Sequence, residues 1–594
     1  MNTKKQNRII SIITRFVIIL LLIPSCEKVL DVSNTGEIDE SAAWGDPNAI
    51  DLMVTNIYYY CEPEHWKNGY YPTDKNAYVF RYTQGIISDE GRPRIEYLGR
   101  RSNVNNGTAF RLEGCPFQTW SYSAVRRCND FLEKIDKLYV LPDNAPQSEI
   151  DNRNRMIGEV TFFRAYKYWR MVMIYGGIPI VDKVLNPDSP ELYGPRNTME
   201  ECFNFILKDL QRAADLLPST YPSGNLGRIT KGAALAMLSR VQLFRASPLY
   251  NESHNTTYWQ DASKSARAVL DLNIYSIEGV EFGSWFTVKN NTENIYQIEF
   301  VLGKFEHGWD AANHPNVPWA KGDAVATCPS QELVDAFPML NGKAITDAVS
   351  GYDPNDPYNN RDPRLKKTVI TNGDLLGGKA IWTYVSEGKN EASNYKYNGN
   401  GFEMTYATST GYYMRKAIDE RILVTGNYNY GRGSYSDWVE IRLAEVMLNY
   451  AEAENELGNT AVAYDMIGQL RKRAGIAAGD GNYGLAPGLT TDRMREVIQN
   501  ERFIELAFEN KRYWDLRRWR LSEIVLNQPT HSMKITKKNN TPPTTNGTDY
   551  TYERLVNTND QVYPPVFQEK FYFLPLPKDQ LILNPNLEQN ELWK

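Results

Sequence analysis

Four tryptophans and an aspartate in the irregular middle of the chain are the residues whose types could do chemistry. They are Trp285, Trp309, Asp310, Trp319 and Trp382. A pyranose presents an apolar C–H face that stacks on aromatic rings, while its hydroxyls hydrogen-bond to carboxylates, amides and guanidinium groups. We therefore expect Asp310 and the first three of these tryptophans to contribute to a sugar-binding surface. Packing in a hydrophobic core is the alternative for each tryptophan.

A second group of polar and aromatic side chains lies in the first loop-rich region, at residues 61–117. Asp89, Arg92 and Tyr97 follow one another closely there. They supply hydrogen bonds to hydroxyl groups together with a ring for stacking. We therefore expect these three residues to contribute to the sugar-binding surface as well.

The sequence offers no catalytic or zinc-binding pattern. No HExxH, CxxC or G-x-S-x-G motif occurs, and the 5 histidines never fall at helical ligand spacing. Among 72 acidic residues, carboxylate pairs that could hydrolyse a glycosidic bond are inevitable, but none stands out. We therefore expect a binding protein with no cofactor and no resident metal, and a surface glycosidase is an alternative.

One stretch partly matches a calcium-binding loop. Asp353, Asn355 and Asn359 have the spacing of calcium ligands. Pro357 occupies a position that needs an oxygen ligand, however, and Arg364 stands where a bidentate glutamate is required. The pattern excludes an EF-hand and leaves adventitious calcium binding open.

The N-terminus has the pattern of a lipoprotein signal peptide over residues 1–25. Basic residues precede a short apolar stretch at 16–23, which leads to a small residue and then Cys26. A membrane span takes roughly 20 apolar residues, and neither this stretch nor any later one is long enough. We therefore expect cleavage before Cys26 and a lipid on that residue, which anchors the mature chain to a membrane. An ordinary signal peptide with a chance cysteine is the alternative.

The charge balance argues against nucleic acid as a partner. The chain has 66 Lys and Arg against 72 Asp and Glu, whereas a nucleic-acid-binding domain needs a basic surface. The aromatic content is 12%, with 38 Tyr and 13 Trp. Aromatic side chains suit interfaces and sugar faces, because they combine an apolar body with a polar edge.

Helical periodicity with short connections dominates two parts of the chain. The predicted helices cover residues 118–137, 148–175, 198–217, 230–245, 258–272, 437–457 and 461–474, and another begins near 491. Successive antiparallel helix pairs are typical of a tetratricopeptide-like superhelix, and an unrelated helical array is the alternative. We predict a mostly α, single-domain fold over residues 26–594, with a helical scaffold at about 41–275 and 436–535, a loop-rich insertion containing a few short strands at about 280–435, and a tail at 536–594.

Residues 500–519 contain an unusually dense run of charged and aromatic side chains. Glu501, Glu505 and Glu509 recur every four residues, which places them on one face of a helix. The stretch ends in arginines interleaved with aromatic residues, side chains that pair with carboxylates and stack on indole rings. We predict a structural helix that ties several others together, with a site of chemistry as the alternative.

Several motifs, taken in order, carry a resemblance to a known family. They are Cys26, FFRAYKYWRMVMIYGGIPIV (162–181), GRITKGAALAMLSRVQLF (227–244), GYYMRKAID (411–419), EIRLAEVMLNYAEAENELG (440–458) with QLRKRAGI (469–476), NERFIELAFENKRYWDLRRW (500–519) and FYFLPLPKDQLILNPNLEQN (571–590). With these motifs, nearly the whole chain resembles the SusD/RagB family of outer-membrane nutrient-binding lipoproteins of Bacteroidota.

The resemblance implies a scaffold of tetratricopeptide-like helix pairs and a function without catalysis. Family members are lipid-anchored at the cell surface of the outer membrane, where they cap a SusC-like TonB-dependent transporter and capture oligo- or polysaccharides for import. The RagB branch captures peptides instead, so a peptide ligand is an alternative, as is a structural adhesin. The quoted motifs belong to the scaffold, so the resemblance carries over no ligand-binding residue.

Overall fold

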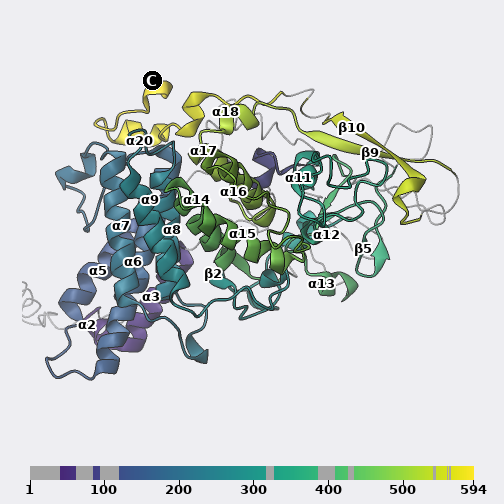
Figure 1. Cartoon of the computed structure of the whole chain (residues 1–594). Helices are drawn as coiled ribbons and strands as arrows, with labels where there is room; N and C mark the ends of the chain where they lie inside the picture. Colours follow the sequence, from purple (N-terminus) through teal and green to yellow (C-terminus); the bar gives the residue numbers. More distant parts are fainter. Residues whose placement is uncertain are drawn as a thin grey trace, which may run out of the picture.

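The computed structural model describes residues 40–61, 84–93, 120–315, 327–384, 408–425, 434–539, 544–557, 560 and 564–594. Its described part is mostly helical, with short two-stranded sheets, which confirms the predicted fold class. In Figure 1 the helices of the first half stand side by side at one end of the molecule. The other end carries loops and the strands β5 (Leu375–Leu376), β9 (His531–Lys537) and β10 (Tyr550–Val556).

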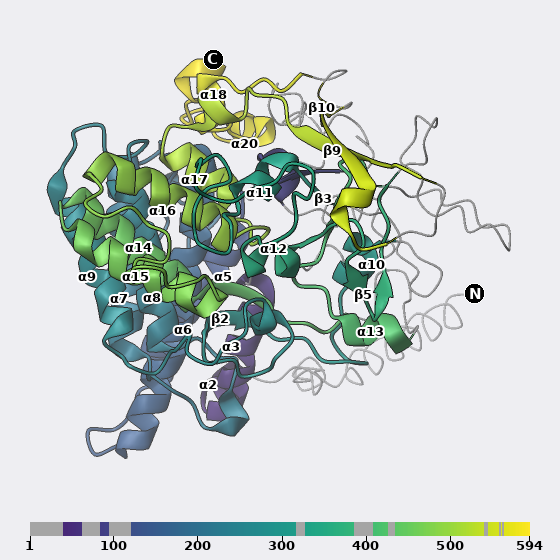
Figure 2. The ribbon, with the colours of Figure 1, turned by 45° about the vertical axis from the view of Figure 1, so that its right-hand side comes forward.

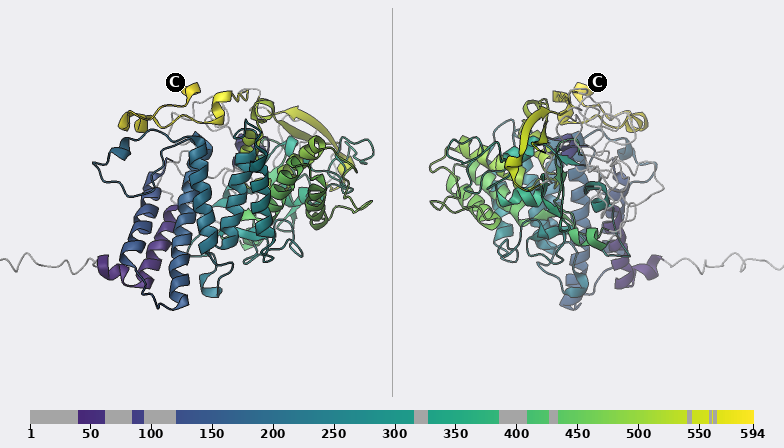
Figure 3. Two further views of the ribbon diagram at one scale, coloured as in Figure 1. Left: turned by 60° about the vertical axis from the view of Figure 1, so that its left-hand side comes forward. Right: turned by 90° about the vertical axis from the view of Figure 1, so that its right-hand side faces the viewer.

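The first half of the scaffold is a row of helices that pack against their neighbours (Figure 3). They are α2 (Glu40–Trp44), α3 (Pro47–Cys61), α5 (Tyr122–Leu138), α6 (Gln147–Tyr175), α7 (Met199–Leu216), α8 (Lys231–Ala246) and α9 (Thr256–Leu270). The bounds predicted for the last five of these helices are confirmed to within four residues.

Local capping signals explain why these bounds were predictable. Thr198 precedes α7, and its hydroxyl accepts a hydrogen bond from the Glu201 backbone N–H while the Glu201 carboxylate accepts one from the Thr198 N–H. Helix α6 ends at Gly176, which has a φ of 79° and therefore suits a residue without a Cβ. Pro179 follows and prevents the helix from continuing.

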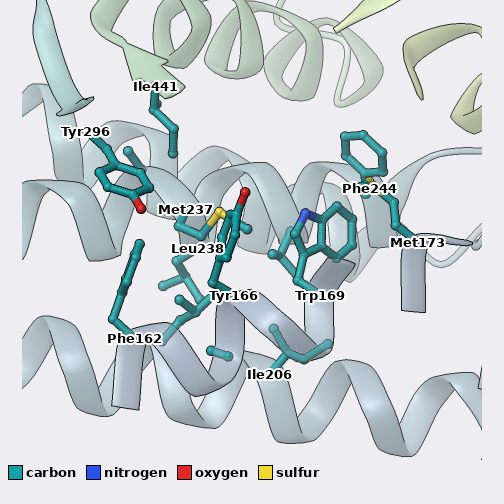
Figure 4. Close-up of a cluster of buried hydrophobic side chains, with 14 of the residues drawn as sticks. Phe162, Tyr166, Trp169, Met173, Ile206, Met237, Leu238, Phe244, Tyr296 and Ile441 are labelled. Atoms are coloured by element: carbon teal, nitrogen blue, oxygen red, sulfur yellow. The ribbon is translucent and has the colours of Figure 1, made fainter. Parts of the chain in front are cut away.

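Helix α6 lies at the centre of the scaffold core. Phe162, Tyr166 and Trp169 project from it among side chains of neighbouring elements (Figure 4). The Trp169 ring meets Phe244 of α8 edge to face at 4.9 Å, and the Phe162 ring meets Tyr296 in the same way at 5.5 Å. Such contacts add to the free energy gained by burying the rings.

The second half of the scaffold packs onto the first, because α14 contacts both α8 and α9. Its elements are β8 (Trp438–Arg442), α14 (Leu443–Glu456), α15 (Thr460–Ala474), α16 (Thr491–Glu505), α17 (Arg512–Arg518) and α18 (Ser522–Val525). The prediction of a helix from residue 437 was wrong over 438–442. This segment is the strand β8, all of it buried, and it pairs antiparallel with β2 (Asn294–Ile298).

The prediction of a helix extending over residues 500–519 was also wrong in one respect, since the chain leaves helical geometry after Glu505. The carbonyl oxygen of Glu505, which a longer helix would use internally, accepts hydrogen bonds from Lys416 Nζ and Arg442 Nη2. The N–H of Phe508 donates instead to Glu90 Oε1 at 2.9 Å. Side chains distant in sequence therefore end α16, and α17 starts separately.

Ten buried charged side chains surround the acidic face of α16, and we call this group the α16 knot. Glu505 alone pairs with Arg364, Arg442 and Arg473. No member's side chain is more than 6% exposed. The knot has equal numbers of acids and bases, namely Glu293, Asp362, Glu501, Glu505 and Glu509 with Arg364, Lys416, Arg442, Arg471 and Arg473.

The remaining described elements are short and lie in the insertion, in the connections between scaffold helices or in the C-terminal tail. They are η4 (Gln84–Ile87), β1 (Gly91–Arg92), η6 (Pro190–Tyr193), η7 (Ser223–Asn225), η8 (Ser284–Phe286), α10 (Trp309–Asn313), β3 (Cys328–Pro329), α11 (Gln331–Ala336), α12 (Pro363–Thr368), β4 (Val369–Ile370), β6 (Lys379–Ala380), β7 (Tyr413–Met414), α13 (Glu420–Thr425), η9 (Gly547–Asp549), η10 (Glu569–Tyr572), α20 (Lys578–Leu583) and η11 (Glu591–Trp593). The sheets pair β1 with β3, β4 with β7, β5 with β6, and β9 with β10. Helix α12 thus leads directly into strand β4.

The C-terminal segment runs across the ends of the scaffold helices (Figure 3). The Leu574 N–H donates to the Ile174 carbonyl at the end of α6, and Arg196 Nη1 donates to Asn590. Within the described residues, no helix is both long and apolar enough to cross a membrane.

Candidate functional site

Trp285, predicted to contact a sugar, is completely buried in the insertion. The Arg442 guanidinium carbon lies 4.0 Å from the centre of its ring, and the Phe282 ring meets it edge to face at 5.0 Å. A stacking sugar needs an accessible ring face, which these neighbours occupy in this structure. The tryptophan instead covers one side of the α16 knot.

Trp309 and Asp310 lie together at the start of α10, where both are buried. The Trp309 ring packs on Trp438 at 6.2 Å. Asp310 Oδ1 accepts a hydrogen bond of 2.6 Å from the Asp419 N–H, and burial raises the pKa of Asp310 to about 7. His307 Nδ1 accepts from the Trp309 N–H. These groups form an internal polar cluster in place of the predicted exposed surface.

Asp89 and Arg92 are also buried, and each forms a bidentate ion pair. Asp89 accepts from Arg512 Nε and Nη2 at 2.9 and 2.8 Å. Arg92 donates through Nε and Nη2 to Asp560, with a shortest distance of 2.6 Å. Their described contacts fasten the 84–93 segment to α17 and to Asp560.

The structure therefore brings three of the predicted site residues into the insertion core and two into ion pairs elsewhere. Cys26, Tyr97 and Trp319 lie outside the described residues. The prediction that these eight residues carry the lipid or contact a sugar stays a prediction. In this structure, the five described ones have internal partners and no open face for a ligand.

A half-buried group of aromatic residues at the other end of the molecule does present accessible rings. We call it the aromatic ledge, and its members are Trp382, Tyr384, Tyr550 and Tyr552. The rings of Trp382 and Tyr384 are 6.2 Å apart, and those of Tyr384 and Tyr550 are 5.6 Å apart. Tyr550 is buried beneath the group, while the other three are partly exposed.

Two segments distant in sequence build this ledge. Trp382 and Tyr384 follow β6, whereas Tyr550 and Tyr552 belong to β10. In Figures 1 and 2 the β9–β10 hairpin and β5 lie at the same end of the molecule, away from the scaffold helices. Each pair is spaced by two residues, and in an extended chain this spacing puts both side chains on one face. That spacing is the signal in the sequence that could have indicated the ledge.

Tight backbone contacts hold the ledge in place. Gly373 has a φ of 88°, and a Cβ added there would lie 3.1 Å from the Trp382 ring. Its N–H donates to the Ile381 carbonyl at 2.7 Å, and the Tyr550 hydroxyl donates to the Thr544 carbonyl at 2.9 Å. The ring positions are therefore set before any ligand arrives.

A cavity of about 40 Å³ between α6 and α17 is a less suitable ligand site. Trp169, Arg170, Lys511 and Trp514 are among the residues that line it. Pockets that bind small molecules have volumes of roughly 300–1,000 Å³, whereas a single water needs about 10–15 Å³. This cavity is large enough for water and too small for a sugar.

The described residues contain no group of three or more His, Cys, Asp and Glu side chains that could hold a metal ion. In the candidate calcium segment, Asp353 Oδ1 accepts hydrogen bonds from the Asn355 backbone and side-chain amides at 2.8 and 3.1 Å. These contacts form a local turn. Adventitious calcium binding there stays a prediction.

Comparison with known proteins gives consistent matches. The model of the SusD family matches residues 289–593, and a model described as "Starch-binding associating with outer membrane" matches residues 30–243. A SusD-like protein from Formosa agariphila, P2, is 25% identical over 519 residues, which cover 85% of each chain. A SusD-like protein from Bacteroides ovatus is 22% identical and covers 84% of this chain and 80% of its own.

Solved structures share the fold. A SusD-like protein from Bacteroides fragilis superimposes with a TM-score of 0.69 at 24% identity, covering 93% of this chain and 98% of its own. A SusD-like carbohydrate-binding protein from the same species gives a TM-score of 0.68 at 22% identity, covering 92% and 100%. Because the SusD family model spans more than half of the sequence and the fold agrees, the chain belongs to the SusD family.

Proposed function

We propose that this protein is a glycan-binding lipoprotein on the cell surface, which captures oligo- or polysaccharide and caps a SusC-like TonB-dependent transporter for import. Membership of the SusD family carries the proposal. The family model over residues 30–243 is described as starch-binding and associated with the outer membrane. One structural relative is named a carbohydrate-binding protein, and another, from Bacteroides thetaiotaomicron, a surface glycan-binding protein.

The lipid anchor fits the position of the first described helix. Thirteen residues lie between the predicted lipid-bearing Cys26 and the start of α2, and an extended segment of that length reaches at most roughly 50 Å. The anchor would therefore keep the domain close to the membrane and beside a transporter. A Cys26→Ala variant is expected to move from the membrane fraction to the soluble fraction, and membrane retention would contradict the anchor.

Binding without catalysis is part of the proposal. Asp310 and Glu90 are buried carboxyl groups whose pKa values burial raises, to about 7 and about 8. Such values suit general acids. Both side chains are enclosed in the protein, however, with exposed fractions of 0% and 1%, and a general acid must reach the bond it protonates. Release of sugar from a labelled glycan would contradict this part of the proposal.

Affinity electrophoresis tests the ligand class directly. The mature chain, residues 27–594, is run through native gels that contain one soluble polysaccharide each. We expect at least one glycan to retard it relative to an inert protein. Retardation by none would overturn glycan binding by the isolated protein. Displacement of a bound glycan by free peptides would favour the alternative of a peptide ligand.

Capture of a tagged chain from outer membranes tests the transporter. We expect a TonB-dependent barrel to co-purify in stoichiometric amount. Recovery of the tagged chain alone, from membranes in which the barrel is present, would contradict capping.

A further inference from the structure

We propose that the aromatic ledge is a stacking site for neutral pyranose units of a polysaccharide, with Trp382 as its main contact. This inference rests on the proposed function and adds a location and a ligand class to it. Four observations on the described residues carry it: exposure, rigidity, a polar rim and the pairing of nearby charges.

Exposure separates Trp382 from the other tryptophans of the insertion. Trp285 and Trp309 are buried, and Trp438 at its border is 1% exposed. Among the described residues of the insertion, Trp382 is the one tryptophan that is not buried. Because the Trp382 side chain is partly exposed, a sugar can cover the exposed part of its ring without any rearrangement of the core.

The ledge is also rigid, which lowers the entropic cost of binding. Gly373 packs under Trp382, and Thr545 lies beside Gly373, with its Cα 3.6 Å from a Cβ built there. The Thr383 N–H donates to Asn372 Oδ1 at 2.9 Å, which fixes the backbone between the two rings of this segment. The Tyr552 hydroxyl donates to the Gly547 carbonyl at 3.1 Å.

Hydroxyl and amide groups form the rim of the ledge. Thr544, Thr545 and Asn546 are exposed in the segment that precedes η9 and β10, and Thr545 lies beside Gly373, which packs under Trp382. Such side chains donate and accept hydrogen bonds without a charge. The Thr544 hydroxyl donates to Asp549, and Asn546 Oδ1 accepts from Thr548. Thr545 is therefore the rim residue that we expect to meet the hydroxyl groups at the edge of a sugar ring whose face rests on the indole.

The charged side chains near the ledge favour a neutral ligand. Asp374 Oδ2 accepts hydrogen bonds of 2.8 Å from the Thr371 N–H and hydroxyl, and Asp549 accepts one from the Thr544 hydroxyl. Lys538 Nζ donates to the Thr548 carbonyl at 2.8 Å, and the buried Lys537 places its Nζ 6.0 Å from the centre of the Tyr384 ring. These charged side chains thus already interact with other groups of the protein. A binding site for a polyanion, in contrast, needs cationic side chains that point at the ligand.

The test compares Trp382→Ala with the native mature chain in affinity gels that contain the retarding glycan. We expect the dissociation constant for that glycan to rise about ten-fold or more. Trp382→Tyr keeps a stacking ring and is expected to retain most of the binding. Trp259→Ala removes a partly exposed tryptophan from scaffold helix α9 and serves as the matched control, with binding unchanged.

A second variant covers the case in which Trp382→Ala fails to fold. Thr545→Arg changes an exposed residue of the rim and places a long side chain beside Trp382, so it should weaken binding while the thermal midpoint stays at the native value. Circular dichroism and thermal melting check both variants.

The outcomes are distinguishable. If Trp382→Ala and Thr545→Arg both fold and bind the glycan as tightly as the native chain does, the ledge is not the binding site, and the proposed function is unaffected. Absence of native binding to every glycan would overturn the proposed function itself. Stronger retardation by uronate-rich than by neutral polysaccharides would overturn the neutral ligand class.

Discussion

The scaffold and the insertion are both rich in aromatic and charged residues but use them differently. In the scaffold, rings such as Phe162 and Trp169 are fully enclosed, and buried carboxylates are paired with guanidinium groups. The insertion has its own core around Trp285, yet part of its aromatic surface, at Trp382 and Tyr384, stays open to solvent. The comparison teaches that residue type alone does not distinguish a tryptophan of the core from one that is partly exposed, such as Trp382.

Buried carboxyl groups show the same contrast. In the α16 knot, burial disfavours ionisation of Glu505, but Arg473, Arg442 and Arg364 outweigh it and hold the pKa below its usual range. In the insertion, Asp310 lacks a cationic partner among the described residues, and burial raises its pKa. Charge pairing therefore keeps the carboxylates ionised where the insertion meets the second half of the scaffold, whereas Asp310 is buried without such a pair in the described part of the chain.

The largest expected effect is the loss of Arg442 from the α16 knot. Arg442→Ala leaves Glu293, Glu505 and Glu509 each with one fewer cation in a buried site, which should destabilise the protein by about 5 kcal/mol. Urea unfolding followed by circular dichroism measures the change. Arg267→Ala, which removes an exposed pair with Asp271, is the control and should leave the midpoint unchanged. If the two variants lowered the stability equally, buried and exposed ion pairs would contribute equally to the stability of this protein.

Trp285→Ala comes next and separates the two kinds of tryptophan. It opens a cavity beside Arg442 and Phe282 in the insertion core, so the free energy of unfolding should fall by about 3–4 kcal/mol. Thermal melting detects this as a lower midpoint. A Trp285→Ala protein that is as stable as native but binds glycan poorly would show that the ring serves a ligand and not the core.

Asp310→Asn should remove the pH dependence that this carboxyl group gives to stability. Because the pKa of Asp310 is about 7 in the folded state and near 4 when unfolded, the folded state binds more protons between these values. This group's contribution to stability is therefore full below about pH 4 and is lost as the pH rises to 7.

The amide side chain of the variant cannot ionise. The free energy of unfolding of the variant, minus that of the native protein, should therefore be larger at pH 8 than at pH 5 by on the order of 2 kcal/mol. Urea midpoints at the two pH values measure it, with Asp271→Asn as a control for the removal of one exposed charge. An identical pH dependence in Asp310→Asn and the native chain would refute the assignment.

The smallest effect concerns a surface feature of the scaffold. Thr198→Ala removes the hydroxyl that caps α7, and about 1 kcal/mol of stability should be lost. Thr198→Ser keeps the hydroxyl and should behave like the native chain. A loss equal to that of Arg442→Ala would mean that α7 depends on its cap more than on its packing.

The sequence predicted the scaffold well because its signals are local. Thr198, Gly176 and the αL residue Gly475 mark helix ends by their own chemistry. The end of α16 could not be predicted in this way, since Lys416 and Arg442 cap it from far along the chain.

The same reason limits prediction of the candidate site. Nothing near Trp285 in sequence indicates that Arg442 covers its ring. For the aromatic ledge, the sequence shows only the two-residue spacing between Trp382 and Tyr384 and between Tyr550 and Tyr552. It does not show that β10 lies beside the segment of Trp382 and Tyr384.

The distribution of the α16 knot along the chain has a consequence for the order of folding. Glu293 and Arg364 precede the acidic face of α16 by more than a hundred residues, and Glu509 is the last of its charges to be synthesised. A chain that ends before residue 501 therefore holds the five basic members of the knot but only two of its acids, Glu293 and Asp362. We expect such truncated chains to remain partly unfolded and sensitive to proteases.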